Sequence, residues 1–411
     1  MISTFLTILA LCFASQTHSY EPIQAVCSVP VADLLVLPMA DYQLNKNTRQ
    51  AYEQLPLSWV HSKKICPRDH QLLFNEVVTI INENEEEYCI ELSQSFYETP
   101  LEHFAHYRYW TLKSNMVKLT DLDLNTLISI PEPISVHKNN ISQANYNIIT
   151  LKFPYQDSTT EKTYSAGTRF VMRGKKDETT VDIPVVAYGS NITKLPKSHC
   201  VCGGDETDYE HYTSEAEKIH NFVELLQQWA TMPQHHIPVV WGGCSFTHVY
   251  SNDITFSQMP RTIETGETFQ HWASSEQTQS PLGGFDVSGL ILRAAQICDI
   301  PYYYRNTLTA MRNMQKLGKN ETLSEGDLIW IPGGLAVVTS LEKNSVVTLL
   351  GYWSGYGRVF QTTLNKLFNG VDTFDQLIDM YHRQESLQLL SLDGTATNVD
   401  EFKLLKISSV F

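Results

Sequence analysis

The chain has 411 residues, of which 42% are hydrophobic and 18% charged. That length suits roughly two to four ordinary domains, and the composition excludes wholesale disorder, collagen-like repeats and coiled coil. The formal net charge is −15, from 30 Lys and Arg against 45 Asp and Glu. Because an acidic chain without a basic stripe repels phosphates, neither nucleic acid nor an anionic membrane surface is an expected partner.

The chain begins with a short apolar run, Phe5 to Ala14, which is too short to span a bilayer. Thr17 and Ser19 are small residues at the −3 and −1 positions of a cleavage site before Tyr20. This pattern predicts a signal peptide over 1–19 and an exported protein, either periplasmic or secreted. The alternative is an N-terminal strand of a cytosolic protein. No other segment approaches transmembrane length.

Of the eight cysteines, Cys12 lies in the predicted leader, which leaves seven. An odd number requires at least one unpaired thiol. Cys66 and Cys89 could cross-link in an oxidising compartment, but buried free cysteines are the default expectation at this density. Cys200 and Cys202 form a C-x-C pair without a second pair at zinc spacing, so neither a metal nor another cofactor is expected.

The first half of the mature chain, to about Ile192, alternates short β-type runs with turns. Two small β-barrels are the natural interpretation of this pattern. A polar stretch, 39–58, is expected as an insertion loop or short helix in the first barrel. The first group of runs is 28–35, 71–81, 88–92 and 109–112, and the second is 146–151, 167–172 and 182–188.

The second half changes character after Tyr212. Ser214 and Glu217 form a capping box, followed by apolar residues at helical spacing, which predicts a helix of about sixteen residues. A second helix is expected after 284–289. Three strands follow, the last two joined as a hairpin, so helices precede an antiparallel sheet and an α+β domain is predicted. These strands are 327–332, 335–341 and 346–352.

Three blocks in this half carry a resemblance: Trp-Gly-Gly at 241–243, Gly-Phe-Asp-Val-Ser-Gly-Leu-Ile at 284–291, and Gly-Asp-Leu-Ile-Trp-Ile-Pro-Gly-Gly at 326–334. They resemble the NlpC/P60 family of papain-like cysteine peptidases, which cut peptidoglycan stem peptides. The β-rich half is similar to the two bacterial SH3 (SH3b) domains of the γ-D-glutamyl-L-diamino acid endopeptidase branch. The segments that carry this second likeness are 30–34, 71–76, 151–157 and 164–171.

The resemblance implies a multidomain protein, with two all-β SH3-like barrels followed by an α+β papain-like NlpC/P60 domain. The segments that it assigns are a first SH3b-like domain at 25–122, a second at 123–205, an NlpC/P60-like domain at 210–385 and a C-terminal extension at 386–411.

The chemistry of that family needs a thiolate at a helix N-terminus and a histidine base on the facing strand. The family's nucleophile lies between the Asp and Ser of Asp-Cys-Ser-Gly, and here that position is Val287. The base position is Gly334, with Leu335 as the near alternative, and the orienting residue would lie near Thr348. A tyrosine common in the family is replaced by Val239. The resemblance therefore implies a cysteine-peptidase scaffold without catalysis: a pseudoenzyme that acts as a binder or regulator.

Two other interpretations stay open. Cys244 follows the Trp-Gly-Gly block, and His248 comes four residues later. A displaced nucleophile and base at these positions would make the chain an active endopeptidase. Alternatively, the chain is an interaction module that uses its barrels alone, with the cleft closed.

The expected ligand is a peptidoglycan stem peptide with a free N-terminal L-Ala. Asp286 and Ser288 flank the lost nucleophile, and a carboxylate here would pair with the ligand's amine; helix capping by Asp286 carries equal weight. Trp241 lies in the loop near the cleft. The resemblance also points Tyr107 and Tyr109 of the first barrel toward the cleft, while a place in the barrel core is the plainer interpretation of these aromatics.

Overall fold

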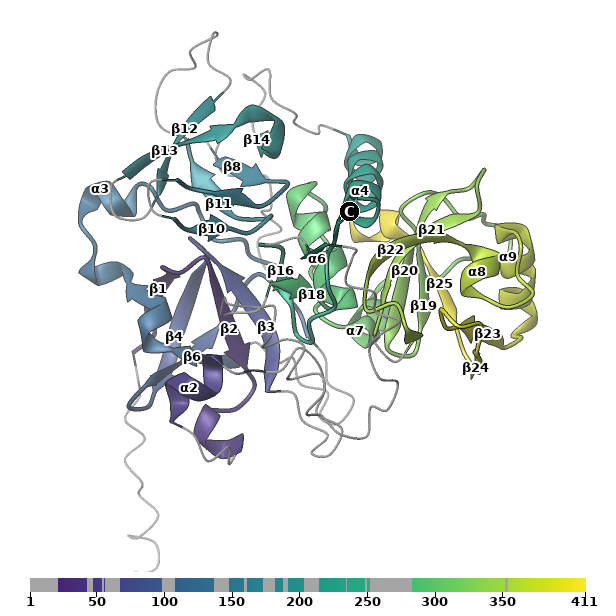
Figure 1. The fold of residues 1–411 in the computed structure, drawn as a ribbon, viewed down its shortest axis with the longest axis horizontal. Helices are drawn as coiled ribbons and strands as arrows, with labels where there is room; N and C mark the ends of the chain where they lie inside the picture. Colours follow the sequence, from purple (N-terminus) through teal and green to yellow (C-terminus); the bar gives the residue numbers. More distant parts are fainter. Residues whose placement is uncertain are drawn as a thin grey trace, which may run out of the picture.

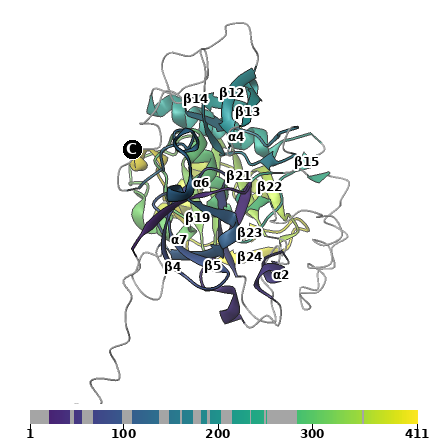
Figure 2. The same ribbon diagram turned by 90° about the vertical axis from the view of Figure 1, so that its left-hand side faces the viewer.

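The computed structural model has three β-rich units. Figure 1 shows the second unit above the first on the left and the third on the right, and Figure 2 views the molecule from the side of the first two. The predicted leader lies outside the described residues. No helix in the described part is long and apolar enough to cross a membrane. The residues that the structure describes are 21–42, 47–53, 55, 67–97, 108–136, 148–158, 161–172, 182–187, 191–202, 214–233, 235–247, 250–251, 283–351 and 354–411.

The first unit is one antiparallel sheet of seven strands in the order β3-β2-β6-β5-β4-β1-β7. All seven strands contribute side chains to a single apolar cluster, which includes Leu34, Leu72, Ile80 and Tyr109. The sheet therefore curls around its own core. Its strands are β1 (Ile23–Cys27), β2 (Val31–Leu35), β3 (Arg68–Leu73), β4 (Val77–Glu83), β5 (Glu87–Glu91), β6 (Arg108–Leu112) and β7 (Met116–Lys118).

This sheet does not close into a ring within the described residues, because β3 and β7, at the two ends of the order, are not paired with each other. The single run expected at 71–81 is two strands, β3 and β4. Asn75, with a φ of 68°, makes the turn between them. The expected short helix in the insertion is confirmed as a 3-10 turn at Met39–Tyr42 and α2 at Thr48–Glu53. Cys89 is a buried free thiol, and Cys66 lies outside the described residues.

The second unit follows two 3-10 turns (Lys113–Asn115 and Leu119–Asp121) and the short helix α3 (Leu124–Leu127). Its core is small, and Phe74 from the end of β3 packs into it beside Tyr164 and Phe170. The first two units therefore share apolar packing. The strands form a three-stranded sheet, β8 (Ile148–Leu151), β11 (Arg169–Val171) and β14 (Cys200–Cys202), and two pairs, β9 (Tyr155–Gln156) with β10 (Thr163–Tyr164) and β12 (Asp182–Ala187) with β13 (Asn191–Pro196).

The third unit begins with α4 (Glu215–Ala230), and the predicted capping box is confirmed. Ser214 accepts a hydrogen bond from the Glu217 backbone N–H, and the Glu217 side chain accepts one from the Ser214 N–H. The second predicted helix is confirmed as α6 (Val287–Ile297), and every residue of it is buried. It is followed by α7 (Thr307–Asn313). Two short strand pairs lie between α4 and α6: β15 (His235–His236) with β17 (Tyr250–Ser251), and β16 (Cys244–Ser245) with β18 (Gly284–Phe285).

An antiparallel sheet of five strands forms the centre of this unit, in the order β22-β21-β20-β19-β25. One face packs on α4 and α6, and the other is covered by α8, α9 and a hairpin. The three strands predicted from the sequence are confirmed. The elements are β19 (Leu328–Ile331), β20 (Gly334–Ser340), β21 (Ser345–Leu350), β22 (Arg358–Thr363), α8 (Leu364–Leu367), α9 (Phe374–Arg383), hairpin strands β23 (Leu387–Leu390) and β24 (Ala396–Val399), β25 (Lys403–Leu405) and a final 3-10 turn (Ile407–Val410).

The segment expected as a C-terminal extension is built into this sheet. β25 pairs antiparallel with β19, and Leu404 lies opposite Ile329 in that register. Leu404 is fully buried, and Ile407 joins the cluster around α4 and α6. The last residues of the chain therefore complete the sheet that supports α6.

We expect Leu404→Ala to lower the free energy of unfolding by about 2–5 kcal/mol, because it opens a cavity in a core that is close-packed. The matched control is Leu392→Ala, at a leucine that is 57% exposed, which should change it by less than about 0.5 kcal/mol. Urea unfolding of both variants measures the difference. Equal effects would show that the C-terminal strand is not part of the core.

Candidate functional site

The expected reaction centre lies at the start of α6, where Asp286 is the N-cap. Its side chain accepts a 2.6 Å hydrogen bond from the Gly289 backbone N–H. A Cβ at Gly289 would lie 2.1 Å from the carbonyl oxygen of Gly243, so only glycine lets the helix approach this turn so closely. The strand before the helix, β18, pairs with β16. The strand-turn-helix geometry of the site is thus fixed by local sequence.

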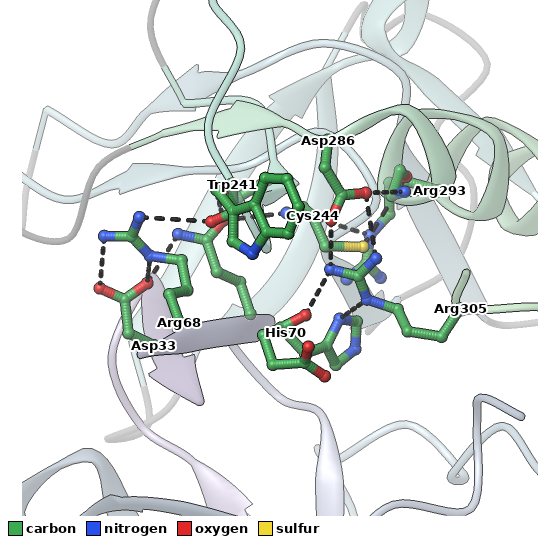
Figure 3. Close-up of polar contacts among 12 residues, drawn as sticks. Asp33, Arg68, His70, Trp241, Cys244, Asp286, Arg293 and Arg305 are labelled. Atoms are coloured by element: carbon green, nitrogen blue, oxygen red, sulfur yellow. Dashed lines mark hydrogen bonds and ion pairs between the residues drawn. The ribbon is translucent and has the colours of Figure 1, made fainter. Parts of the chain in front are cut away.

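A buried guanidinium, that of Arg305, joins this helix cap to the first unit (Figure 3). Its two terminal nitrogens donate to the two carboxylate oxygens of Asp286, at 3.0 and 2.8 Å. One of them also donates to the Asp69 carbonyl at 2.6 Å, and Nε donates to His70 Nδ1 at 2.8 Å. Burial lowers the pKa of Arg305, but the Asp286 carboxylate and the other negative groups near the guanidinium, including Asp69, together raise it. Arg305 therefore stays charged and engages both oxygens of Asp286.

Backbone pairing extends the same contact. The Phe96 N–H donates to the Tyr303 carbonyl at 2.7 Å, and the Arg305 N–H donates to the Phe96 carbonyl at 2.8 Å. Tyr97 follows, half-buried beside Arg305 and Asn306. Burial and then the charge of Asp69 raise the pKa of Tyr97. A segment of the first unit thus runs alongside 303–305 and brings an aromatic side chain to the site.

Strand β3 makes further buried polar contacts with the third unit. The Gln71 side-chain carbonyl accepts from the Cys244 N–H at 3.0 Å and from the Ser245 hydroxyl at 2.8 Å. The Gln71 amide donates to Asp33 at 2.8 Å. Asp33 also binds Arg68 through two hydrogen bonds, at 2.7 and 3.2 Å. Each buried polar atom named here has a hydrogen-bond partner, because an unpaired polar atom inside the protein would cost free energy.

The turn after Val240 lies directly on β3. Gly242 has a φ of +67°, and a Cβ there would lie 2.6 Å from the Arg68 carbonyl oxygen. Arg68 in turn donates a 3.5 Å hydrogen bond to the Trp241 carbonyl. The glycines of the Trp-Gly-Gly block therefore allow the first unit and α6 to meet on opposite sides of one turn.

A second buried guanidinium, that of Arg293, ties the middle of α6 to the same strand region. Its NH1 donates to Glu76 at 2.7 Å and to Gln296 at 2.9 Å, and its Nε donates to the Cys244 carbonyl at 3.1 Å. Burial lowers the pKa of Arg293, but Glu76 and Cys244 together raise it. The first unit is thus fixed against the site by the Arg293–Glu76 ion pair and by the hydrogen bonds from Arg305 to His70 and the Asp69 carbonyl.

No protein-family model matches the sequence, and no curated protein is similar to it. Similar solved structures include an NlpC/P60 family protein from Bacillus cereus ATCC 10987, which is 15% identical. The alignment covers 83% of this chain and 94% of that chain, with a TM-score of 0.50. NlpC2 and NlpC1 of Trichomonas vaginalis are 10% and 8% identical, both with TM-scores of 0.29, over 84% and 87% of this chain and 94% and 93% of theirs.

The fold is that of an NlpC/P60 family protein. At 15% identity the likeness concerns the fold. In this NlpC/P60 fold, the position expected for the nucleophile is Val287, the first residue of α6, which is 8% exposed. Leu335 of β20 and Leu349 of β21 belong to the same apolar cluster and are 2% and 5% exposed. The centre between helix and sheet is therefore dry and apolar.

The structure places Gly334 and Thr348 on the other face of the sheet, away from α6. A Cβ on Gly334 would lie 2.7 Å from the Ile331 side chain, which belongs to the second cluster of the unit. Thr348 lies between Val347 and Leu349, whose side chains both face α6, so its own side chain points away. The strand position that faces the helix is Leu335. Neither Gly334 nor Leu335 has an atom that accepts a proton.

Cys244 is a poor nucleophile in this geometry. Its side chain is fully buried, and the thiol donates to the Gly289 carbonyl at 3.7 Å. Burial raises the pKa of Cys244, and the nearby Arg293 and Arg305 offset this effect only in part. A buried thiol with a raised pKa is not a thiolate at neutral pH. His248, its expected partner, lies outside the described residues.

The other expected binding residues divide into three groups. Trp241 is 44% exposed. Ser288 and Tyr109 are buried, at 4% and 1% exposure. Tyr109 belongs to the apolar core of the first unit, which was one of the two interpretations of this residue from the sequence. Tyr107 lies outside the described residues.

Four residues at the site were not singled out from the sequence: Asp69, His70, Tyr97 and Arg305. One signal was available, because Arg-Asp-His at 68–70 is a charged run at the start of a strand that continues with apolar residues. Such residues are rarely buried unless paired. Among the described residues, no three His, Cys, Asp or Glu side chains gather in a way that could hold a metal ion.

We expect Cys244 in the native protein to resist alkylation by iodoacetamide at pH 8 and to react only after denaturation, because its thiol is buried and protonated. Peptide mapping by mass spectrometry locates the label on each cysteine. Rapid modification of Cys244 in the folded protein would contradict this geometry.

Proposed function

We propose that this protein is an exported, catalytically inactive protein of the NlpC/P60 fold that binds peptidoglycan stem peptides as a binder or regulator. The observation that carries the proposal is the apolar character of the expected reaction centre, with Val287 at the helix N-terminus and Leu335 on β20 in the same cluster, both buried. We also propose that the first two units are SH3-like domains, on the resemblance of their sequences.

The size of the rate loss expected without a nucleophile and a base argues against hydrolysis. Removing either member of such a pair costs about 10⁶ in rate, and losing the second adds little because the two act as a unit. Valine and leucine replace them with side chains that pack well in an apolar cluster. The expected rate of stem-peptide hydrolysis is therefore close to background.

Recognition of a free N-terminal amine would fall to Asp69 rather than Asp286. Both oxygens of Asp286 already bind Arg305, so that carboxylate is neutralised. Asp69 is a second, half-buried carboxylate, and its charge acts on Tyr97 and Tyr109 by raising their pKa values after burial has done so. The ammonium group of an L-Ala terminus is the kind of cation that such a carboxylate beside aromatic rings attracts.

Hydrolysis by a displaced nucleophile is the second candidate function. The buried position of Cys244 makes it the less favoured one. Cys244 lies in the β16–β18 strand pair, and its buried thiol donates to the Gly289 carbonyl. A substrate carbonyl could reach the sulfur only if β16 left β18. The inactive binder is the function that the geometry supports better.

Calorimetry with L-Ala-γ-D-Glu-diaminopimelate tests the binding proposal. We expect a Kd between about 1 μM and 1 mM, equivalent to about −8 to −4 kcal/mol. N-acetylation of the peptide and Asp69→Asn should each weaken binding by about 10-fold or more, because each removes one charge of the same pair. The matched control, Asp121→Asn at an exposed position, should leave the Kd unchanged.

Two outcomes would overturn this proposal. If neither the free nor the acetylated peptide binds at millimolar concentration, the protein does not bind stem peptides. If the free peptide binds and Asp69→Asn has no effect while Asp286→Asn abolishes binding, the amine lies at the helix cap, and our assignment of Asp69 is wrong.

A rescue experiment tests which strand position faces the helix. Val287→Cys combined with Leu335→His places a thiol and an imidazole on facing positions, and we expect weak but measurable release of L-Ala-D-Glu. The activity should stay low because the next strand supplies Leu349, which cannot orient a base. Val287→Cys with Gly334→His is the control, and it should stay inactive because residue 334 points to the opposite face. Activity in the control alone would contradict the observed register.

A further inference from the structure

His70 lies buried where the first unit meets the third, and its hydrogen bonding fixes its protonation state (Figure 3). Its Nδ1 accepts a 2.8 Å hydrogen bond from Arg305 Nε, and a guanidinium can only donate. Nδ1 is therefore unprotonated, and the neutral ring carries its hydrogen on Nε2. Among the residues that the structure describes, that Nε2 has no hydrogen-bond partner, and the ring is fully buried. The ring thus depends on Arg305 for its one polar contact.

The charges that face His70 all disfavour a second proton on the ring. Arg305 approaches from 303–305, and Arg293 lies on α6. From β6, the Tyr109 ring lies with its centroid 6.0 Å away and brings no negative charge. Asp69 is the adjacent residue on β3, and neighbouring side chains of a strand point to opposite faces. Asp286, beyond Arg305, is already paired with it. Burial first, then Arg305 and Arg293, hold the pKa of His70 well below its ordinary value.

We propose that His70 makes the contact between the first unit and the Arg305 loop labile to acid. A proton on Nδ1 removes the acceptor for Arg305 Nε and places two cations in direct contact. The imidazolium is then stable only if β3 moves away from Arg305 and water reaches the ring. Arg305 keeps its pair with Asp286, so the break falls between β3 and the loop. This inference does not depend on any ligand.

The direction of the pH dependence follows from the number of protons that the closed and open states bind. His70 is neutral in the closed contact and takes up a proton in the open one, so the open state binds more protons. Opening is then favoured as the pH falls below about 6.5, the ordinary pKa of histidine. One proton per opening event makes the opening equilibrium rise about 10-fold per pH unit below that point.

Hydrogen exchange on the full chain, comparing wild type with His70→Asn, tests the proposal. The side-chain oxygen of asparagine can replace Nδ1 as acceptor for Arg305, but it does not titrate. At pH 7.5 both proteins should protect the Arg305 and Cys244 amides equally. At pH 5 the wild type should exchange these amides at least 10-fold faster than His70→Asn. The Val338 amide, which donates to Asp327 within the third unit, should exchange equally in both.

Equal exchange of Arg305 and Cys244 amides in both proteins at pH 5 would overturn the proposal. Faster exchange of Val338 as well would also overturn it, because the effect would then be global unfolding. Should His70→Asn fail to fold, nitrogen NMR of histidine-labelled wild type decides alone. We expect His70 to stay neutral until the Arg305 amide loses protection, and an ordinary titration near pH 6.5 with that amide still protected would refute the acid-labile contact.

Discussion

Two buried guanidinium groups set the geometry on which the rest of this molecule depends. Arg305 and Arg293 both lie in the third unit, and each reaches across to the first, to His70 and Asp69 in one case and to Glu76 in the other. Arg293 would lose its charge partner if Glu76 moved away, and an unpaired buried charge costs about 3–5 kcal/mol. Arg305 has its charge partner, Asp286, in its own unit and contacts the first unit through hydrogen bonds to His70 and the Asp69 carbonyl. The first unit and α6 are therefore held in register by one ion pair and by buried hydrogen bonds, in addition to apolar packing.

The position at which the sequence comparison expects the reaction centre is apolar and buried. A thiolate and a base have to be kept polar and accessible beside a helix end, which conflicts with burial. Val287, Leu335 and Leu349 resolve that conflict by joining the apolar cluster that already packs α4 and α6 on the sheet. The buried polar groups described here lie instead at the contact with the first unit, where Arg305 joins Asp286, His70 and the Asp69 carbonyl.

Features set by local sequence were predictable. The capping box at Ser214 and the cap at Asp286 position two helices correctly, because each rests on residues three apart in the chain. The register of the strands was harder to predict from the sequence. Gly333 and Gly334 offer two ways to place the following residue, and a slip of one residue exchanges the faces of a strand. The structure resolves this in favour of Leu335 facing α6.

Contacts between distant segments could not be predicted from the sequence. Arg305 and His70 are 235 residues apart in the chain, and the sequence around one does not indicate that it contacts the other. The strand β25 was missed as a sheet member because it follows an irregular stretch and is only three residues long. Such a short strand is specified by its neighbour β19 rather than by its own sequence.

Incubation of the purified full chain with L-Ala-γ-D-Glu-diaminopimelate, followed by mass spectrometry for L-Ala-D-Glu, tests the central claim most directly. The account predicts that product stays at the level of a protein-free blank while the intact tripeptide is recovered. Turnover well above the blank that disappears in Cys244→Ala would contradict it, because the chain would then be a working hydrolase with a displaced nucleophile.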